Sequence, residues 1–251
     1  MRTTIRFTVL ICLLLLLKGC GKEEKAAAPA AVTQAPPAAQ PAPAPEPQPY
    51  VVELRAVGKK FEGPSEIPSG WTTFKFVNAS SMIHFAIIDV PPPGVTMQQM
   101  SDEAMTPFQE AMDAMNAGDE EAVNAAFGKF PAWISELKRN GGPGLTSPGH
   151  TSQTTVWLDP GHYVIECYVK SDGVFHTTSP GPGQIGMMLD LTVTDEPNNA
   201  PEPEGDATLT IRNTGYELLG DLRPGQNTIR VDFPEQQALP SFVGNDVHLI
   251  R

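Results

Sequence analysis

One strand decides the fold of this chain, and it reads Gly161-His-Tyr-Val-Ile-Glu-Cys167. The turn residues Asp159-Pro-Gly161 come directly before it, and a cysteine ends it. Other short apolar or alternating runs, also separated by Gly/Pro turns, lie on both sides; they are 51–55, 72–78, 84–90, 154–158 and 188–193. Short strands with such turns predict an all-β fold, a Greek-key β-sandwich.

A different composition interrupts these strands from Thr96 to about Arg139. Apolar side chains recur there at three- and four-residue steps, which is typical of a helix, and Asp119 is a candidate N-cap for a second helix. We therefore predict a helical insertion at about 96–139. Its methionines are interpreted as fillers of a helix–sheet interface, with thioether ligation of cuprous copper as the alternative; they are Met97, Met100, Met105, Met112 and Met115.

The N-terminus predicts export. Two arginines precede an apolar run, Phe7 to Leu17, that is too short to span a bilayer but suits a signal peptide of residues 1–19. The following Leu17-Lys-Gly-Cys20 resembles a bacterial lipobox, which implies that Cys20 is acylated and becomes the first residue of the mature chain. Because Gly21 is not the aspartate that retains lipoproteins at the inner membrane, we expect attachment to the outer membrane, facing the periplasm.

Composition divides the rest of the chain. Residues 20–49 form an Ala/Pro-rich tether with almost nothing to build a core. A globular domain is expected over 50–194, followed by a Pro/acidic/Asn linker at 195–205 and a tail at 206–251.

The chain is acidic, with a formal net charge of −12, which becomes −15 without the signal peptide. This charge argues against a nucleic-acid partner and against electrostatic binding to anionic lipid. The expected contact with the membrane is therefore the lipid anchor alone.

Cys167 has no cysteine partner in the chain if Cys20 carries lipid and Cys12 is removed. Cysteines of exported proteins usually pair, so an unpaired one is a buried small hydrophobe, a metal ligand or an intermolecular link. His176 follows it, and then Met187. A thiol, an imidazole and a thioether are ligands that copper accepts.

At this point the chain resembles a family. The segments that carry the resemblance are Ile67-Pro-Ser-Gly-Trp-Thr-Thr-Phe-Lys-Phe-Val-Asn78, Gly141-Gly-Pro-Gly144, Leu158-Asp-Pro-Gly-His-Tyr-Val164 and Gly173-Val-Phe-His176. Together with His84, Cys167 and Gly186-Met187 they resemble the cupredoxin-like domains of bacterial exported proteins, relatives of plastocyanin and azurin. The resemblance covers about 50–194 without the insertion.

The resemblance implies one copper ion of the type-1 kind, held by His84, Cys167 and His176, with Met187 as the axial ligand. Cys167 and His176 are separated by eight residues, similar to the type-1 domain of copper nitrite reductases, whereas ten residues separate His176 from Met187. Because that second spacing is long, Met188 stays an alternative axial ligand. Non-ligating roles in the core stay open for each of the four, and His150 and His162, beside turn glycines, are expected at the surface.

The tail repeats the opening strands. Leu222-Arg-Pro-Gly225 and the strand after it match Ile67-Pro-Ser-Gly70 and its strand, so we expect a partial second cupredoxin-like repeat over 206–251. Asn245 stands where His84 stood, and no second cysteine strand follows, so this part is not expected to bind copper by itself. Its strands could cover an edge of the first domain, meet another copy or reflect a truncated chain.

Two functions follow from these observations. The first is a lipid-anchored copper protein that relays single electrons to a redox partner or carries copper in the periplasm. The second is a metal-free cupredoxin-fold module that binds another envelope protein through its insertion and acidic surface. No acid/base pair or substrate pocket is visible in the sequence, so we do not expect an enzyme.

Overall fold

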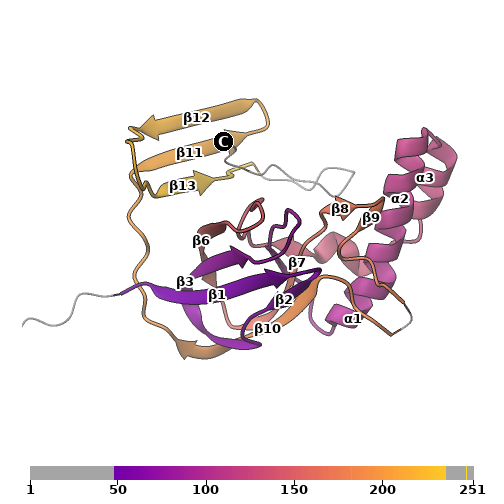
Figure 1. Ribbon diagram of the computed structural model, residues 1–251, viewed down its shortest axis with the longest axis horizontal. Helices are drawn as coiled ribbons and strands as arrows, with labels where there is room; N and C mark the ends of the chain where they lie inside the picture. Colours follow the sequence, from indigo (N-terminus) through magenta and orange to yellow (C-terminus); the bar gives the residue numbers. More distant parts are fainter. Residues whose placement is uncertain (1–47, 182, 236–246, 248–251) are drawn as a thin grey trace, which may run out of the picture. The chain divides into compact units, whose positions relative to one another are not determined.

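The computed structural model describes residues 48–181, 183–235 and 247. The first layer of its sandwich has the strand order β2-β1-β3, with β6 on the far side of β3 (Figure 1). β1 pairs parallel with β3, while β2 and β6 pair antiparallel with β1 and β3. The strands of this layer are β1 (Tyr50–Val57), β2 (Lys60–Glu62), β3 (Glu66–Asn78) and β6 (Thr151–Leu158).

The second layer carries the cysteine strand. Its order is β3-β10-β7-β4-β5, and β7 pairs antiparallel with both of its neighbours, β10 and β4. The added strands are β4 (Ile87–Val90), β5 (Lys138–Arg139), β7 (Gly161–Glu166) and β10 (Met188–Pro197). A separate short hairpin pairs β8 (Lys170–Ser171) with β9 (Val174–Phe175).

One glycine lets β3 serve both layers. Residues up to Ser69 pair with β10, and residues from Gly70 onward pair with β6. Gly70 has φ +113°, a conformation that L side chains rarely adopt, and a Cβ there would lie 2.8 Å from the Asn198 side chain. Because only glycine fits both the angle and the space, it allows the strand to change sheets.

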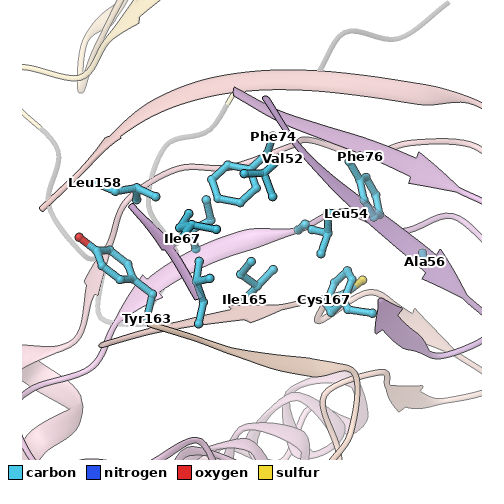
Figure 2. Close-up of a cluster of buried hydrophobic side chains, with 14 of the residues drawn as sticks. Val52, Leu54, Ala56, Ile67, Phe74, Phe76, Leu158, Tyr163, Ile165 and Cys167 are labelled. Carbon is cyan, nitrogen blue, oxygen red and sulfur yellow. The ribbon is translucent and has the colours of Figure 1, made fainter. Parts of the chain in front are cut away.

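The core lies between the two layers (Figure 2). Alternate residues of β3 point inward, and Phe74 and Phe76 are 1% and 0% exposed. Tyr163, Ile165 and Cys167 reach the same core from β7 and the residue after it. Burying each large apolar side chain stabilises the fold by about 1.5–3 kcal/mol, so this interior fixes the positions of the strand ends.

The helical insertion follows β4. It contains α1 (Met97–Gln99), a π-helix η1 (Met100–Met105), α2 (Thr106–Ala117), α3 (Glu120–Phe127) and a 3-10 helix η2 (Ala132–Glu136). Asp119 caps α3 by accepting a hydrogen bond from the amide of Ala122, as predicted. Met100 packs with Val164 and Met188 in a second apolar cluster, so this methionine fills a helix–sheet interface. Among the described residues, no helix is long and apolar enough to cross a membrane.

The tail forms a three-stranded sheet of β11 (Ala207–Arg212), β12 (Gly215–Gly220) and β13 (Ile229–Asp232). β11 pairs antiparallel with β12 and parallel with β13, as β1 does with β2 and β3. Gly225 has φ +110°, close to the +113° of Gly70. The described part of the tail therefore repeats the opening unit of the fold, whereas Asn245 lies outside the described residues.

The prediction of an all-β sandwich with a helical insertion is confirmed. One detail is wrong, because β4 begins at Ile87 rather than at His84. His84 instead forms an isolated bridge with Thr146. The strand is shorter because residues 84–86 pair with the loop at 143–146 through an isolated bridge rather than through a continuous ladder of hydrogen bonds.

A buried pair of carboxyl groups lies on the face of β4 and β7 opposite the main core. Asp89 and Glu166 are 0% and 1% exposed, and Arg139 lies at the edge, with its Nε 3.8 Å from Asp89. Burial raises the pKa of both groups, and for Glu166 the nearby charge of Asp89 adds to the rise. Because a protonated carboxyl group carries no charge, the raised pKa values favour keeping a proton on this buried pair.

This pair predicts a pH dependence of stability. Because the pKa values of Asp89 and Glu166 are higher in the folded protein than in the unfolded chain, proton binding to the pair stabilises the fold. This contribution to the free energy of unfolding is fully present below the ordinary carboxyl pKa range and is lost as the pH rises through the pKa values of the folded protein. The loss is up to about 1.4 kcal/mol per pH unit for each proton retained. Asp89→Asn keeps a neutral partner for Glu166, so its free energy of unfolding should fall less than that of the wild type between pH 5 and 8. Urea unfolding of the metal-free proteins measures this, with the exposed Asp102→Asn as control; equal slopes for Asp89→Asn and the wild type would contradict it.

Candidate metal centre

Asn78 fixes the loop that leads to the first candidate ligand. It ends β3, is 0% exposed, and donates from Nδ2 to the carbonyl oxygens of Met82 and Thr146, each at 2.7 Å. Its Oδ1 accepts from the Ser80 amide at 3.0 Å and the Ser80 hydroxyl at 2.8 Å. One buried side chain therefore ties together both chain segments that flank His84.

The loop after the insertion holds His84 from its other side. The amide of His84 donates to Thr146 at 3.2 Å, and the amide of Thr146 donates back to His84 at 2.7 Å. The amides of Ala86 and Ile88 donate to Pro143 and Gly141 in the same manner. The Gly141-Gly-Pro-Gly144 motif is thus a main-chain support for the histidine segment.

Cys167 follows the end of β7, where the pairing with β10 continues. Its amide donates to the carbonyl oxygen of Met187 at 3.2 Å, and the amide of Met187 donates to His176 at 2.7 Å. A Cβ on Gly186 would lie 2.2 Å from the carbonyl oxygen of Thr177, so only glycine permits this close approach. The main chains of Cys167, His176 and Met187 are therefore locked side by side.

The second histidine comes from the hairpin after the cysteine. β8 and β9 form this hairpin, and His176 follows it directly, with its amide donating to Val169 at 2.9 Å. The hairpin thus brings His176, nine positions after Cys167, back to the Cys167 side chain as a second candidate ligand.

Three side chains converge in the interior: Cys167 and His84 are 0% exposed and His176 is 3% exposed. The Cys167 Sγ lies 3.5 Å from Nδ1 of His84 and 3.8 Å from Nδ1 of His176, and the two Nδ1 atoms are 3.1 Å apart. Ligands that each bind a metal at about 2 Å must lie within about 4 Å of one another. The described residues therefore contain a three-ligand cluster that could hold a metal ion.

Burial sets the protonation of this cluster in the metal-free protein. It raises the pKa of the Cys167 thiol to about 11, because the thiolate loses its contact with water. It lowers the pKa of His176 to about 4 and also lowers that of His84, since an imidazolium would be equally poorly solvated. Both imidazoles are thus neutral, with lone pairs for a metal, and the thiol must lose its proton when a metal binds.

The outward nitrogens of the two rings differ. Nε2 of His176 lies 2.9 Å from the hydroxyl of Ser171, so it carries the hydrogen of the ring when Nδ1 binds a metal. Nε2 of His84 is buried and has no hydrogen-bond partner among the described residues. The main chain of Gly58 raises the pKa of His84 and so opposes part of the effect of burial. Both Nδ1 atoms therefore face the thiol, and Ser171 orients one of the rings.

Two adjacent methionines occupy different clusters. Met187 is 0% exposed and belongs to the main core cluster with Cys167, whereas Met188 packs with Val164 and Met100 on the other side of β10. The arrangement favours Met187 over Met188 as an axial neighbour of the cluster. Its ligation stays a prediction.

The structure thus brings together the predicted side chains His84, Cys167 and His176, with the main chain of Met187 bonded to two of them. His150 is exposed and bonds to Pro148, and His162 pairs with Asp190 at 2.5 Å, away from the cluster. Cys20 lies outside the described residues. Sequence reasoning missed Ser171 and Thr146; a hydroxyl in the short spacer between a cysteine and a histidine is the signal that could have indicated Ser171.

Comparisons with known proteins find similar solved structures. No protein-family model matches this chain, and a search of curated proteins finds no match. Among solved structures, the chain is similar to a reduced auracyanin from Roseiflexus castenholzii, with 20% identity over 57% of this chain and 95% of that one, and a TM-score of 0.31.

Two further solved structures are similar. Auracyanin A, a blue copper protein from Chloroflexus aurantiacus, has 21% identity over 58% of this chain and 99% of its own, with a TM-score of 0.32. A copper-containing nitrite reductase from Thermus scotoductus has 13% identity over 65% of this chain and 32% of its own, with a TM-score of 0.26. The strand pairing and the placement of the three convergent side chains, which agree with the expected pattern, define the fold as a cupredoxin-like β-sandwich.

The Asn78 network predicts a large cost for its removal. Asn78→Ala leaves the carbonyl oxygens of Met82 and Thr146 and the amide and hydroxyl of Ser80 without this partner, and at about 1 kcal/mol for each bond the loss should be roughly 3–4 kcal/mol. Asn140→Ala, which removes one bond to the Trp157 carbonyl, is the control and should cost about 1 kcal/mol. Chemical denaturation of both variants measures the difference, and equal losses would contradict the role given to Asn78.

Proposed function

We propose that this protein binds one copper ion in a type-1-like site and transfers single electrons. The observation that carries the proposal is the buried cluster in which one sulfur and two imidazole nitrogens lie 3.1–3.8 Å apart. One soft sulfur, two imidazoles and a neighbouring thioether are the donor set of blue-copper electron-transfer sites. The His2Cys set lacks the four strong donors typical of a closed structural zinc site.

The arrangement favours electron transfer over catalysis. A copper ion held by His84, Cys167 and His176 would supply one-electron exchange between Cu(II) and Cu(I), with a reduced partner protein as the source of the electron and an oxidised one as its acceptor. The chain's own residues keep the donors buried and hold their main chains by hydrogen bonds, so little movement accompanies the change of charge. Because all three donors are buried, little space is left for a substrate, and we propose an electron carrier or copper carrier rather than an enzyme.

We further propose that the protein is lipid-anchored through Cys20 and acts in the cell envelope, at the outer membrane facing the periplasm. This part of the proposal rests on the sequence of the N-terminus alone. The Ala/Pro-rich tether at 20–49 would then hold the copper domain away from the membrane and within reach of a redox partner or another envelope protein.

The copper proposal predicts a colour that depends on one sulfur. The purified full-length protein, loaded with one equivalent of Cu(II), should show an intense thiolate-to-copper charge-transfer band. Cys167→Ser should abolish the band and weaken copper binding by more than about 100-fold, the upper end of what loss of an outer-shell partner costs. His150→Ala is the control and should keep the band, because this exposed histidine is remote from the cluster.

Visible absorption and metal analysis make the measurement. A folded, colourless wild type without stoichiometric copper would exclude the copper function and leave the metal-free binding module as the remaining hypothesis.

The adjacent methionines predict a difference between two matched variants. Met187→Leu removes the thioether of the core cluster that contains Cys167, so the copper-loaded variant should have a higher reduction potential and a shifted charge-transfer band, because the axial ligand tunes the potential. Met188→Leu changes a residue of the other apolar cluster and should leave both properties close to the wild-type values. Redox titration followed by absorption measures them; an effect of Met188→Leu alone would assign the axial position to Met188.

A further inference from the structure

The ligand hairpin depends on contacts from outside itself. β8 and β9 contribute two residues each, and their turn contains Asp172 with φ +54° and an exposed Gly173 with φ +80°. Isolated two-stranded hairpins are marginally stable in water even when they are longer. His176 follows the hairpin directly, so a loose hairpin would leave the second imidazole poorly positioned.

From the contacts of helix α2 we infer that Gln109 is a positioning residue for His176, and that the helical insertion serves to clamp the ligand hairpin. This inference rests on the proposed copper function. It assigns to the insertion a task in the metal site that the ligands themselves do not show.

Gln109 uses both ends of its amide. Oε1 accepts from the Phe175 amide at 2.8 Å and from the Thr178 hydroxyl at 3.4 Å. Nε2 donates to the Gly173 carbonyl at 3.0 Å and to Asp113 at 2.7 Å. One side chain of α2 therefore holds the main chain just before β9, at Gly173, and within β9 at Phe175, the residue that precedes His176.

Neighbouring residues of α2 support the same hairpin. Asp113 accepts from Lys170 of β8 at 2.6 Å, and the Lys170 ammonium lies 5.1 Å from the centre of the Phe175 ring. Phe108 packs against that ring with the centroids 4.9 Å apart. The lysine pair is partly exposed and contributes little by itself, so the amide of Gln109 is the directional element of the contact.

The contact of Gln109 with the hairpin affects the candidate metal site in two ways, through the main chain of Phe175 and through the hydroxyl of Ser171. The hairpin also carries Ser171, whose hydroxyl meets Nε2 of His176 at 2.9 Å. Holding Phe175 fixes the main chain before the histidine, and holding the hairpin fixes the hydroxyl that orients its ring. Such outer contacts keep a ligand in its binding geometry without touching the metal.

The insertion supplies a matched control. Gln98 bonds to Asp102 four residues later, as Gln109 bonds to Asp113, and both glutamines are partly buried. Within the described part of the chain, the side chain of Gln98 makes hydrogen bonds to Asp102 and none to the hairpin. Gln109→Met and Gln98→Met therefore remove the same chemical group from the same kind of helical pair, and only the first removes the clamp.

The first measurement needs no metal. Hydrogen exchange of individual amides in the metal-free full-length protein should show exchange at Phe175 about 5- to 30-fold faster in Gln109→Met than in the wild type, the factor for one hydrogen bond of 1–2 kcal/mol. Gln98→Met should leave Phe175 unchanged.

The second measurement uses the copper-loaded protein. Gln109→Met should shift the charge-transfer band and the copper hyperfine splitting in electron paramagnetic resonance, and Gln98→Met should shift neither. Unchanged exchange at Phe175, or exchange that rises equally at all amides, would overturn the positioning role. A wild type that binds no copper would instead defeat the proposed function, while exchange at Phe175 would still decide whether Gln109 holds the hairpin.

Discussion

The placement of one thiol between two imidazoles, away from water, is the constraint on which the rest of this structure depends. The three donor side chains come from the segment after β3, the end of β7 and the end of a hairpin, so no single element can align them. Each arrives with its main chain tied to another segment: His84 to Thr146, Cys167 to Met187, and His176 to both Val169 and Met187. These bonds replace the water that the groups lose on burial, and they hold the donor atoms within metal-bonding distance of one another.

Burial favours the neutral forms of different ionisable groups on the two faces of β7. Along this strand Ile165 and Cys167 point into the main core, whereas Val164 and Glu166 point toward the insertion. On the first face, low polarity keeps the imidazoles neutral and the thiol protonated, so a metal that binds there exchanges with a proton. On the second face, the same low polarity raises the pKa of Asp89 and of Glu166 and so favours their neutral forms. Neighbouring residues of one strand thus meet different chemical demands because alternation separates them.

Much of this fold was predictable because its strands alternate and end at glycine or proline, and the segments around Phe74 and Ile165 follow that pattern. The candidate donors were predictable because one cysteine and two histidines stand at marked positions next to strands. The isolated bridge of His84 was not, since its partner, Thr146, lies beyond the helical insertion. Nor were the roles of Ser171 and Gln109, because both act through side-chain hydrogen bonds, and such contacts leave no periodic pattern in a sequence.

The tail shows that the three-stranded scaffold can form without the residues of the candidate metal site. It reproduces the antiparallel and parallel pairing of the opening strands and places Gly225 at nearly the same φ as Gly70. In its described part it carries none of the three predicted ligand types, cysteine, histidine and methionine. The three-stranded unit therefore forms without any metal chemistry, and in the first domain the chemistry is added by the loop after Asn78 and by the segment from Cys167 to Met187. Because those segments gain their order from the Asn78 network and from helix α2 rather than from strand pairing alone, outer contacts decide how well the donors hold their positions.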